Sequence, residues 1–461
     1  MASRYGGKII NDNLLLCLDG ANVNPTYNNF NNTDIVTEFV NLKPNGSSNE
    51  ETLEMGLDPW GRTTVLDRSL NNDTTSNYDG GDTSNTYTGV DSSVKYRFTY
   101  WFRVDEKGNN GNLYFGLYGF NSGGGGIAIR NNGGSSGTTN PYFSYPSHVY
   151  SQFVVGKWYM FVAYVHPAGS TNPTDTTAGF YDVATGLKIT SPSNGNVSHN
   201  AVWDSTHTQT KYRYYLYYST DPNVKMSWYE ARIEKVDGNE PSITDMLNAP
   251  PDRLNDLTNN GYNARSRNGL SYNSSDKSLG FTADDSSHLI IPAYSELDIT
   301  GDMTIECWVN LNSTMNGALC ILATKRYDSD STGPFTLYFE DRTAFYQNTY
   351  SMILGGGGST YTIVGSNNNF NGVYGKWDHV VFTISGTAMT MYVNGTQGGT
   401  ATFSGTRQTN TMPLRLGGVY SYYTANHMLD GKIGAYRMYT KALNSAEILN
   451  NYNTSKSRFG L

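Results

Sequence analysis

The chain has 461 residues, which is too long for one ordinary domain and predicts two or three. Only 16% of the residues are charged, the net charge is −8, and no block of lysine or arginine stands out, so nucleic acid is not expected as a partner. Gly (49) and Tyr (36) are abundant, and because Tyr favours strands and Gly favours turns, this composition is typical of β-sandwiches with long polar loops.

The first predicted strand covers residues 14–19, where leucines surround Cys17. The apolar run is too short for a membrane span or for the apolar part of a secretion signal, so we expect no membrane insertion and no export signal. The three cysteines, Cys17, Cys307 and Cys320, are too few for a disulfide framework, and we expect them to be buried free thiols.

Aromatic segments follow a polar, Asn- and Thr-rich stretch that extends to about residue 87. Residues 96–104, 112–120 and 158–165 have the alternation of strands buried on one face, and a glycine-heavy segment after residue 120 predicts loops. Two short helices are expected, at 241–248 and 444–452. The second has Asn444 as a candidate N-cap and Glu447 three residues later, which is a capping-box-like pattern.

An internal repeat relates the two halves of the chain. The tripeptide Gly-Lys-Trp opens a predicted strand at 156–158 and again at 375–377. Each copy is preceded by a strand centred on a tryptophan and followed by a strand with an arginine and then a short helix. Two sandwiches of related build explain this order. The matching residues are Trp101 and Arg232 in the first half, and Trp308 and Arg437 in the second.

Six segments of the second half form a recognisable series: 302–309, 376–384, 391–395, 414–418, 429–439 and 442–448. Together they resemble the laminin-G-like branch of the concanavalin-A-like lectin/glucanase fold, over most of residues 256–461. The resemblance implies an antiparallel sandwich in which tryptophans such as Trp308 fill the core between the sheets. Asn394-Gly395 would form a hairpin turn.

The segments at 451–461 and 15–22 are similar to the C-terminus and the first strand of virion proteins of tailed bacteriophages. In those proteins a stretch like residues 256–261 follows soon after the first strand, whereas more than two hundred residues intervene in this chain. We therefore expect residues 1–22 to supply an N-terminal arm and the first strand of the C-terminal sandwich, with another domain inserted. The alternative is that residues 14–19 simply start the first domain.

The inserted part, expected over residues 23–254, has a narrower signature in segments 158–169, 179–183 and 233–243. These resemble a carbohydrate-binding-like jelly roll that also occurs in phage structural proteins. The expected fold class is therefore all-β, with two antiparallel jelly-roll β-sandwiches and only short helices. The second sandwich would occupy residues 255–461, and its fold alone does not determine its function.

Glycosidases of the same superfamily need paired carboxylates on one strand face, in an E-x-D-x-E spacing. The nearest match is Glu296 and Asp298, where Thr300 replaces the third carboxylate. A G-x-S-x-G pattern at 133–137 lies in a glycine loop with no strand-to-helix turn around it. We therefore expect no enzymatic activity.

Calcium is the one cofactor that the resemblance implies, because laminin-G-like domains often hold this ion at a loop rim through carboxylates and carbonyls. In the alternative, the acidic pair at 284–285 only caps a turn before the strand at 288–291. The expected calcium ligands are Asp284, Asp285, Asp302 and Asp430.

Two tyrosine-rich regions with Ser, Gly and Asn have the composition of binding surfaces. Exposed aromatic rings of this kind stack on sugar faces beside hydrogen-bonding groups. The alternative is that these tyrosines are ordinary strand or interface residues. The candidate glycan-binding residues are Tyr142, Tyr145 and Tyr150 in the first region, and Tyr420, Tyr422 and Tyr423 in the second.

The leading interpretation is a non-enzymatic structural protein on the surface of a phage virion, as a decoration, fibre or adhesin that binds host-surface glycans. Such a protein would be assembled in the host bacterial cytoplasm with other virion proteins, as a homo-oligomer or on the particle lattice. Two alternatives stay open. One is an architectural capsid, neck or tail component without a sugar ligand, and the other is a glycan-cleaving enzyme, which the incomplete carboxylate motif disfavours.

Overall fold

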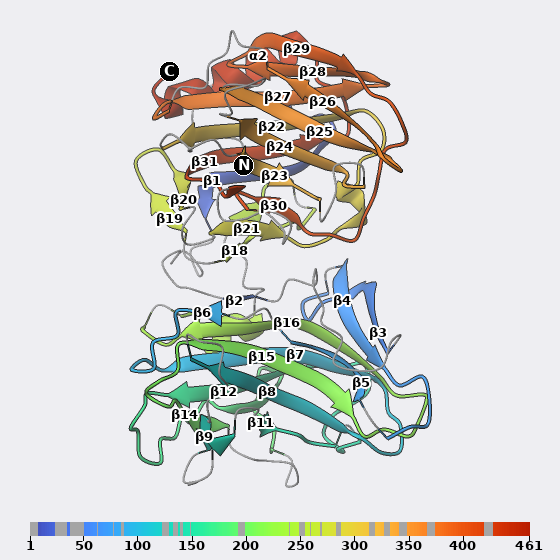
Figure 1. Cartoon of the computed structure of the whole chain (residues 1–461), viewed down its shortest axis with the longest axis vertical. Helices are drawn as coiled ribbons and strands as arrows, with labels where there is room; N and C mark the ends of the chain where they lie inside the picture. The colour runs from blue at the N-terminus through green and yellow to red at the C-terminus, as the bar shows by residue number, and fades with distance from the viewer. Residues whose placement is uncertain are drawn as a thin grey trace. The chain divides into compact units, whose positions relative to one another are not determined.

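The computed structural model divides into two compact units (Figure 1). The split unit combines Met1–Asn31 with Asp252–Leu461, and the inserted unit is Asn32–Pro251. The structure describes residues 8–23, 35–36, 50–61, 63–76, 78–83, 87–121, 129–131, 137–138, 142–147, 149–191, 199–238, 240–248, 254–258, 260–267, 270–282, 287–312, 319–326, 332–340, 348–366, 374–418 and 427–461.

Two antiparallel sheets form the split unit. The first has the order β17 (Leu254–Asp256), β1 (Leu14–Val23), β31 (Gly431–Tyr439), β22 (Met303–Leu311), β27 (Trp377–Ser385), β28 (Ala388–Val393) and β29 (Thr396–Thr402), with β20 (Ser278–Phe281) also on β31 and β19 (Ser271–Asn273) on β20. The second has the order β18 (Arg265–Arg267), β21 (His288–Ile291), β30 (Leu414–Leu416), β23 (Leu319–Thr324), β24 (Phe335–Glu340), β25 (Thr349–Gly357) and β26 (Thr360–Gly365).

The early strand β1 is part of the first of these sheets. It pairs antiparallel with β31, where Leu18 lies opposite Tyr436, and with β17 on its other side. Leu16 and Leu18 are buried in the core between the sheets. The segment expected at 14–19 therefore joins residues from both ends of the sequence in one sheet.

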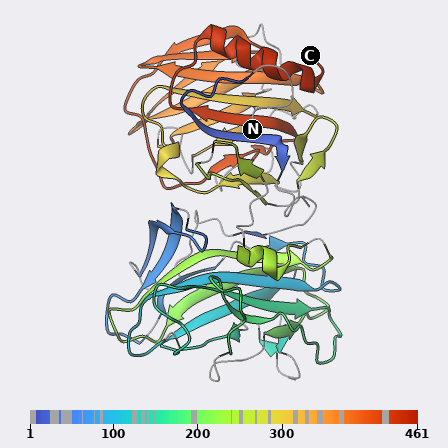
Figure 2. The ribbon, with the colours of Figure 1, turned by 180° about the vertical axis from the view of Figure 1, so that it is seen from behind.

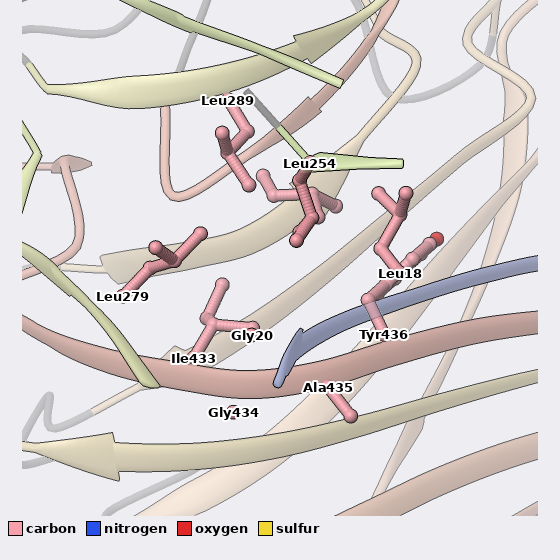
Figure 3. Close-up of a pocket in the computed structure, with 10 residues that line it drawn as sticks. Leu18, Gly20, Leu254, Leu279, Leu289, Ile433, Gly434, Ala435 and Tyr436 are labelled. Atoms are coloured by element: carbon pink, nitrogen blue, oxygen red, sulfur yellow. The ribbon is translucent and has the colours of Figure 1, made fainter. Parts of the chain in front are cut away.

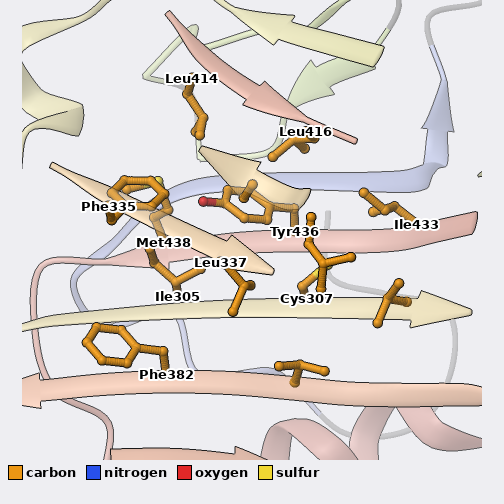
Figure 4. Packing of buried hydrophobic residues seen from close by; sticks show 14 of the residues in the cluster. Ile305, Cys307, Phe335, Leu337, Phe382, Leu414, Leu416, Ile433, Tyr436 and Met438 are labelled. Atoms are coloured by element: carbon orange, nitrogen blue, oxygen red, sulfur yellow. The ribbon is translucent and has the colours of Figure 1, made fainter. Parts of the chain in front are cut away.

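The core of the split unit follows from strand alternation (Figure 4). In β22, Ile305, Cys307 and Val309 face the second sheet and pack with apolar residues such as Leu337 and Phe382. The residues between them point to the opposite face of β22. All three cysteines are buried and unpaired, as the sequence predicted.

The prediction that Trp308 fills the core between the sheets is wrong. Its neighbours Cys307 and Val309 take the core positions, so Trp308 lies on the outer face of the sheet. There it stacks on Phe459 with ring centroids 4.4 Å apart. Phe459 belongs to η4 (Lys456–Phe459), which follows helix α2 (Ser445–Ser455). Figure 2 shows this helix lying along the outside of the sheet.

The start of α2 is the capping box that the sequence predicted. The Asn444 side chain accepts hydrogen bonds from the backbone N–H groups of Ala446 and Glu447, both at 3.0 Å. The Glu447 carboxylate accepts one in return from the N–H of Asn444 at 2.9 Å. These bonds satisfy N–H groups that a helix start leaves without partners.

The inserted unit is also a sandwich of two sheets. The larger has the order β10 (Gly137–Thr138), β9 (Ile129–Asn131), β14 (Asn200–Val202), β12 (Trp158–His166), β7 (Tyr96–Glu106), β16 (Lys225–Lys235), β4 (Thr63–Leu70) and β3 (Glu51–Leu57), with β13 (Gly179–Asp182) on β12 and β2 (Ile35–Val36) on β16. The smaller has the order β11 (Tyr142–Ser144), β8 (Asn112–Phe120), β15 (Gln209–Tyr217) and β5 (Tyr78–Thr83), with β6 (Tyr87–Thr88) on β15. Every described strand pairing is antiparallel except that of β12 with β14.

The repeat in the sequence corresponds to equivalent strands in the two units. The arginine strand, the tryptophan strand and the Gly-Lys-Trp strand are neighbours in the order β31–β22–β27 in one unit and β16–β7–β12 in the other. A short helix follows each arginine strand, namely α1 (Ile243–Asn248) and α2. Three adjacent strands and a helix therefore have the same arrangement twice.

Candidate functional site

The smaller sheet of the inserted unit has an unusual outer face. In β8, Leu113, Phe115 and Leu117 belong to the core, so Tyr114, Gly116 and Tyr118 lie on the opposite face. In β15 the core positions are Tyr212, Tyr214 and Leu216, which leaves Arg213, Tyr215 and Tyr217 for the outer face. Because side chains alternate along a strand, two neighbouring antiparallel strands build a row of tyrosines there.

We call the tyrosines on this outer face the tyrosine layer. Three of their rings form a stack at its centre. Tyr114 is parallel to Tyr215, with centroids 4.8 Å apart and an interplanar angle of 2°. Tyr114 also stacks on Tyr145, with ring centroids 5.4 Å apart and an interplanar angle of 14°. Tyr142 meets Tyr114 edge-on at 4.8 Å. The members of the tyrosine layer are Tyr114, Tyr118, Tyr142, Tyr145, Tyr215, Tyr217 and Tyr218.

The hydroxyl groups of Tyr114 and Tyr215 are held as neutral hydrogen-bonding groups. The Tyr215 hydroxyl donates to that of Tyr142 at 2.5 Å. Burial raises the pKa of Tyr215, and it raises the pKa of Tyr114 to about 12. Both phenols are therefore protonated at neutral pH and can donate as well as accept.

The rim of the layer is open to solvent while its centre is covered. Tyr215 is 1% exposed and Tyr114 is 8% exposed, whereas Tyr218 is 45% exposed. Tyr218 stacks on Tyr217 at 3.7 Å and has a φ of 64°, a backbone conformation that side-chain-bearing residues rarely adopt. The buried centre therefore supports one exposed ring, Tyr218, and several partly exposed rings at its edge.

A single arginine lies within the layer. Arg213 pairs across the sheet with Gly116, which itself pairs with Tyr142 on the next strand. Since Gly116 has no side chain, the guanidinium has room between its neighbours. Its carbon lies 4.6 Å from the ring centres of Tyr118 and Tyr215, and 5.1 Å from that of Tyr142. These are cation–π distances.

The predicted glycan-binding tyrosines divide into three groups. Tyr142 and Tyr145 come together in the tyrosine layer. Tyr150 instead packs on Phe153 at 5.4 Å and donates a hydrogen bond from its hydroxyl to the carbonyl of Thr190 at 3.2 Å. The candidates of the second region, Tyr420, Tyr422 and Tyr423, lie outside the described residues.

Sequence reasoning missed the centre of the layer, namely Tyr114, Tyr215 and Arg213. The signal was present in the alternation of β8 and β15. In N-L-Y-F-G-L-Y and K-Y-R-Y-Y-L-Y, tyrosines continue at positions of the parity opposite to the core residues. A strand that carries aromatic residues on both faces indicates a second aromatic surface in addition to the core.

Two of the four expected calcium ligands, Asp302 and Asp430, lie too far apart to bind the same ion. Asp302 precedes the first residue of β22, and Asp430 precedes β31, whose first residue Gly431 pairs with the last residue of β22. This nine-residue strand separates them by roughly 25 Å, at about 3.3 Å per residue. Asp284 and Asp285 lie outside the described residues. In the described part of the chain no group of three or more His, Cys, Asp or Glu side chains could hold a metal ion.

Asp302 and Asp430 have hydrogen-bonding roles at their own strand ends. Asp302 accepts bonds from the Ser385 hydroxyl at 3.1 Å and from the N–H of Gly386 at 2.8 Å. Asp430 accepts one from the Asn312 amide at 3.1 Å. Each carboxylate therefore fixes a turn next to β22.

The carboxylate pair nearest to a glucanase motif is structural. Glu296 lies in a one-turn 3-10 helix, η2 (Ser295–Leu297), and not on a strand face. The Asp298 carboxylate lies 2.8 Å from the ammonium of Lys325, which is fully buried. Asp298 is therefore held in an ion pair, while Glu296 is exposed and lies outside any strand, so the two acids do not form a carboxylate pair on one strand face.

A pocket between the sheets of the split unit is too small for a sugar (Figure 3). It is lined by apolar residues that include Leu18, Leu279 and Ile433, and its volume is about 10 Å³. That volume is about the size of one water molecule, which would find almost no polar partner there.

Within the described residues, no helix is long and apolar enough to cross a membrane.

One family of known proteins matches part of the split unit. Residues 283–449 match the family described as the concanavalin A-like lectin/glucanases superfamily. No curated protein matches the chain. Among solved structures it is similar to the receptor binding domain of botulinum neurotoxin C/D mosaic serotype (15% identity, 43% of this chain, 48% of the other, TM-score 0.35). It is also similar to the binding domain of botulinum neurotoxin DC in complex with SialylT (16% identity, 44% of this chain, 48% of the other, TM-score 0.35). A third similar structure is the binding domain of Paraclostridial Mosquitocidal Protein 1 (15% identity, 45% of this chain, 50% of the other, TM-score 0.37).

The chain spans about half the length of the solved structures that it matches. At these TM-scores the fold is assigned from the family match and from the sheet topology. The molecule is all-β, with antiparallel β-sandwiches and few short helices, and its split unit has the concanavalin-A-like, laminin-G-like fold.

Proposed function

We propose that this protein binds carbohydrate without cleaving it, and that the tyrosine layer of the inserted unit is the surface that contacts the sugar. The observation that carries the proposal is the stack of Tyr145, Tyr114 and Tyr215, which continues to exposed rings at its rim. A sugar ring has an apolar face of C–H groups and an edge of hydroxyl groups. Flat aromatic rings beside phenol donors and acceptors are complementary to both.

Preorganisation supports the same proposal. Tyr114 and Tyr215 are fixed on the strands β8 and β15, and the Tyr215–Tyr142 hydrogen bond links two of the strands. Rings that are already ordered lose little conformational entropy when a ligand binds. Tyrosine is also the residue that binding surfaces favour, since it gives a large contact area with few rotatable bonds.

We propose binding without cleavage because the two acidic residues nearest to a glycosidase motif are not placed as a catalytic pair. Glu296 is on a short 3-10 helix, and Asp298 is paired with buried Lys325. A retaining or inverting glycosidase needs two carboxyl groups about 5–9.5 Å apart across a bound sugar. Asp298 is held by its ion pair, and Glu296 lies on no strand face from which it could act with Asp298.

The surface of a phage particle is the setting that we propose for this binding. The support is the similarity of residues 15–22 and 451–461 to virion proteins of tailed phages. An adhesin or decoration protein on a particle would use the tyrosine layer to hold host-surface glycans. Cryo-electron microscopy of the particles that carry this chain tests the setting: copies at a tail tip or on the capsid surface support it, and absence from purified particles overturns it.

Glycan binding is tested with the intact chain on a glycan array, followed by titration of the best ligand. The variants Tyr145→Ala and Tyr218→Ala each remove one ring of the layer, and each is expected to weaken binding about tenfold, equivalent to about 1.4 kcal/mol. Tyr361→Ala is the matched control, because Tyr361 is 49% exposed and belongs to β26 of the split unit. Its affinity should equal that of the unmodified chain.

Two results would contradict the proposal. One is an array on which the intact chain binds no glycan. The other is binding that Tyr145→Ala and Tyr218→Ala leave unchanged while the variants stay folded. A chain that occupies regular lattice positions and binds no glycan would instead be an architectural component.

A further inference from the structure

We infer that the tyrosine layer takes acidic glycans, with Arg213 as the group that recognises the sugar's anionic substituent. This inference rests on the proposed function and names its ligand class. The starting observation is that Arg213 is 2% exposed and still has no ion pair and no hydrogen bond among the described residues. Its Nε and Nη1 atoms are buried without a hydrogen-bond partner.

Other buried arginines of the inserted unit provide the contrast. Arg97 is 3% exposed and donates to Glu234 through Nε at 2.8 Å. Arg232 is 1% exposed and lies 2.8 Å from the same carboxylate. Buried charges in proteins are normally paired in this way, because an unpaired ion loses its hydration without compensation. Arg213 departs from the rule that its neighbours in the same unit obey.

The three tyrosine rings around Arg213 replace only part of what the guanidinium loses. The faces of Tyr118, Tyr142 and Tyr215 attract its charge through their π electrons. They do not accept the hydrogen bonds of its N–H groups, and a buried donor without an acceptor is costly. A carboxylate, sulfate or phosphate oxygen would supply both the opposite charge and the missing acceptors.

The surrounding face favours an anion as well. By alternation, the outward positions of β8 and β15 include Lys211 and Arg213 but no aspartate or glutamate. Tyr118 and Tyr142 are partly exposed, while Tyr215 is buried. An anionic group would therefore reach the guanidinium beside these two partly exposed rings, while the sugar ring that carries it lies against the partly exposed ring of Tyr145.

The test compares matched glycan pairs that differ only in charge. The intact chain is titrated with a sialylated oligosaccharide and its desialylated form, with a uronic-acid oligosaccharide and its methyl ester, and with sulfated and phosphorylated sugars and their neutral parents. We expect the acidic member to bind at least tenfold more tightly, with a preference that falls as salt rises. The arm with the largest ratio identifies the anion.

Arg213→Met should abolish the preference, so that the acidic and the neutral member of each pair bind with equal affinity, and Arg213→Lys should retain part of the preference. Tyr361→Ala is again the control, and thermal unfolding verifies that each variant is folded. If Arg213→Met does not fold, the acidic preference of Arg213→Lys and the salt dependence of the unmodified chain test the inference instead. Equal binding of acidic and neutral members overturns this inference and leaves carbohydrate binding standing. Binding of neither member of any pair overturns the proposed function itself.

Discussion

Glu306 is the residue on which the outer face of the split unit's first sheet is organised. Its carboxylate pairs with the Arg437 guanidinium, lies 3.0 Å from His379 Nε2 and accepts a hydrogen bond from the Asn451 amide of α2 at 2.8 Å. Burial alone would raise the pKa of Glu306. Arg437 and then His379 outweigh that effect, so the pKa falls from 4.5 to about 2.

Glu306→Gln should destabilise the split unit at neutral pH by about 3–5 kcal/mol, because it leaves Arg437 as an unpaired buried charge. In the unmodified chain, the stability from Glu306 is present above its unfolded pKa of 4.5 and is lost as pH falls toward about 2. The variant should lose that acid dependence. Hydrogen exchange of the β22 amides, followed by mass spectrometry between pH 7 and pH 3, measures both effects.

The control for this prediction is Asp12→Asn. Asp12 also pairs with a cation, Lys441, at 2.9 Å, but its side chain is 72% exposed. An exposed pair contributes about 0–1 kcal/mol, so this variant should resemble the unmodified chain. Equal exchange rates in Glu306→Gln and Asp12→Asn would show that the buried network adds no stability.

Asp67 in the inserted unit has the opposite dependence on pH. It is fully buried, and burial raises its pKa from 3.8 to about 7, although hydrogen bonds with Tyr214 and Glu51 offset part of the rise. Asp79 also has its pKa raised to about 7 by burial. The folded unit therefore holds protons that the unfolded chain has released between pH 3.8 and about 7, and its stability falls as pH rises through this window.

We expect the inserted unit to be more stable at pH 5 than at pH 8 by about 2 kcal/mol or more. Asp67→Asn carries no charge at either pH and should reduce that difference, and adding Asp79→Asn should reduce it further. Exchange of the β7 amides at the two pH values gives the measurement, with β22 of the split unit as an internal reference. A unit that gains stability from pH 5 to pH 8 would refute this account.

At the scale of the element, alternation and capping predicted the strands that bury large apolar faces. Residues 96–104 and 158–165 lie within β7 and β12, and the helix expected at 444–452 overlaps α2, which starts one residue later and has Asn444 as its N-cap. The strands β3, β4 and β5 lie in the polar, Asn- and Thr-rich stretch, for which the sequence pattern predicts no strands. β4 explains why, since Asp67 and Ser69 are fully buried in it and break the apolar pattern.

The candidate site could be predicted only in part for a related reason. Loop composition pointed to Tyr142 and Tyr145, which belong to the layer. Their partner Tyr215 is more than sixty residues away in sequence. Strand parity gives the face on which a side chain lies, but not which strands are neighbours or in which register. The pairing of β8 with β15, which places Tyr114 opposite Tyr215, depends on the whole sandwich.

At the scale of the whole molecule, β1 makes the split unit discontinuous in sequence. It lies between β17 and β31, contributes Leu16 and Leu18 to the core, and places Asp19 2.5 Å from the Arg458 guanidinium. Where the chain leaves β1 and returns to β17, Val23 and Leu254 are direct register partners. The two ends of the inserted segment are therefore adjacent in an antiparallel ladder, about 5 Å apart.

This geometry predicts that the inserted unit can be removed without unfolding the rest. Replacing residues 24–253 by a short Asn-Gly hairpin loop should give a chain that unfolds cooperatively and keeps the hydrogen-exchange protection of β22, because two strands so paired need only a two-residue turn. A chain that starts at Leu254 lacks β1, exposes the edge of β31 and two leucine-sized gaps in the core, and should be unfolded or aggregated.

The chain in which the hairpin loop replaces residues 24–253 also lacks the tyrosine layer, so it should bind none of the glycans that the full chain binds. If it kept them, sugar recognition would belong to the split unit, and the tyrosine layer would need another explanation.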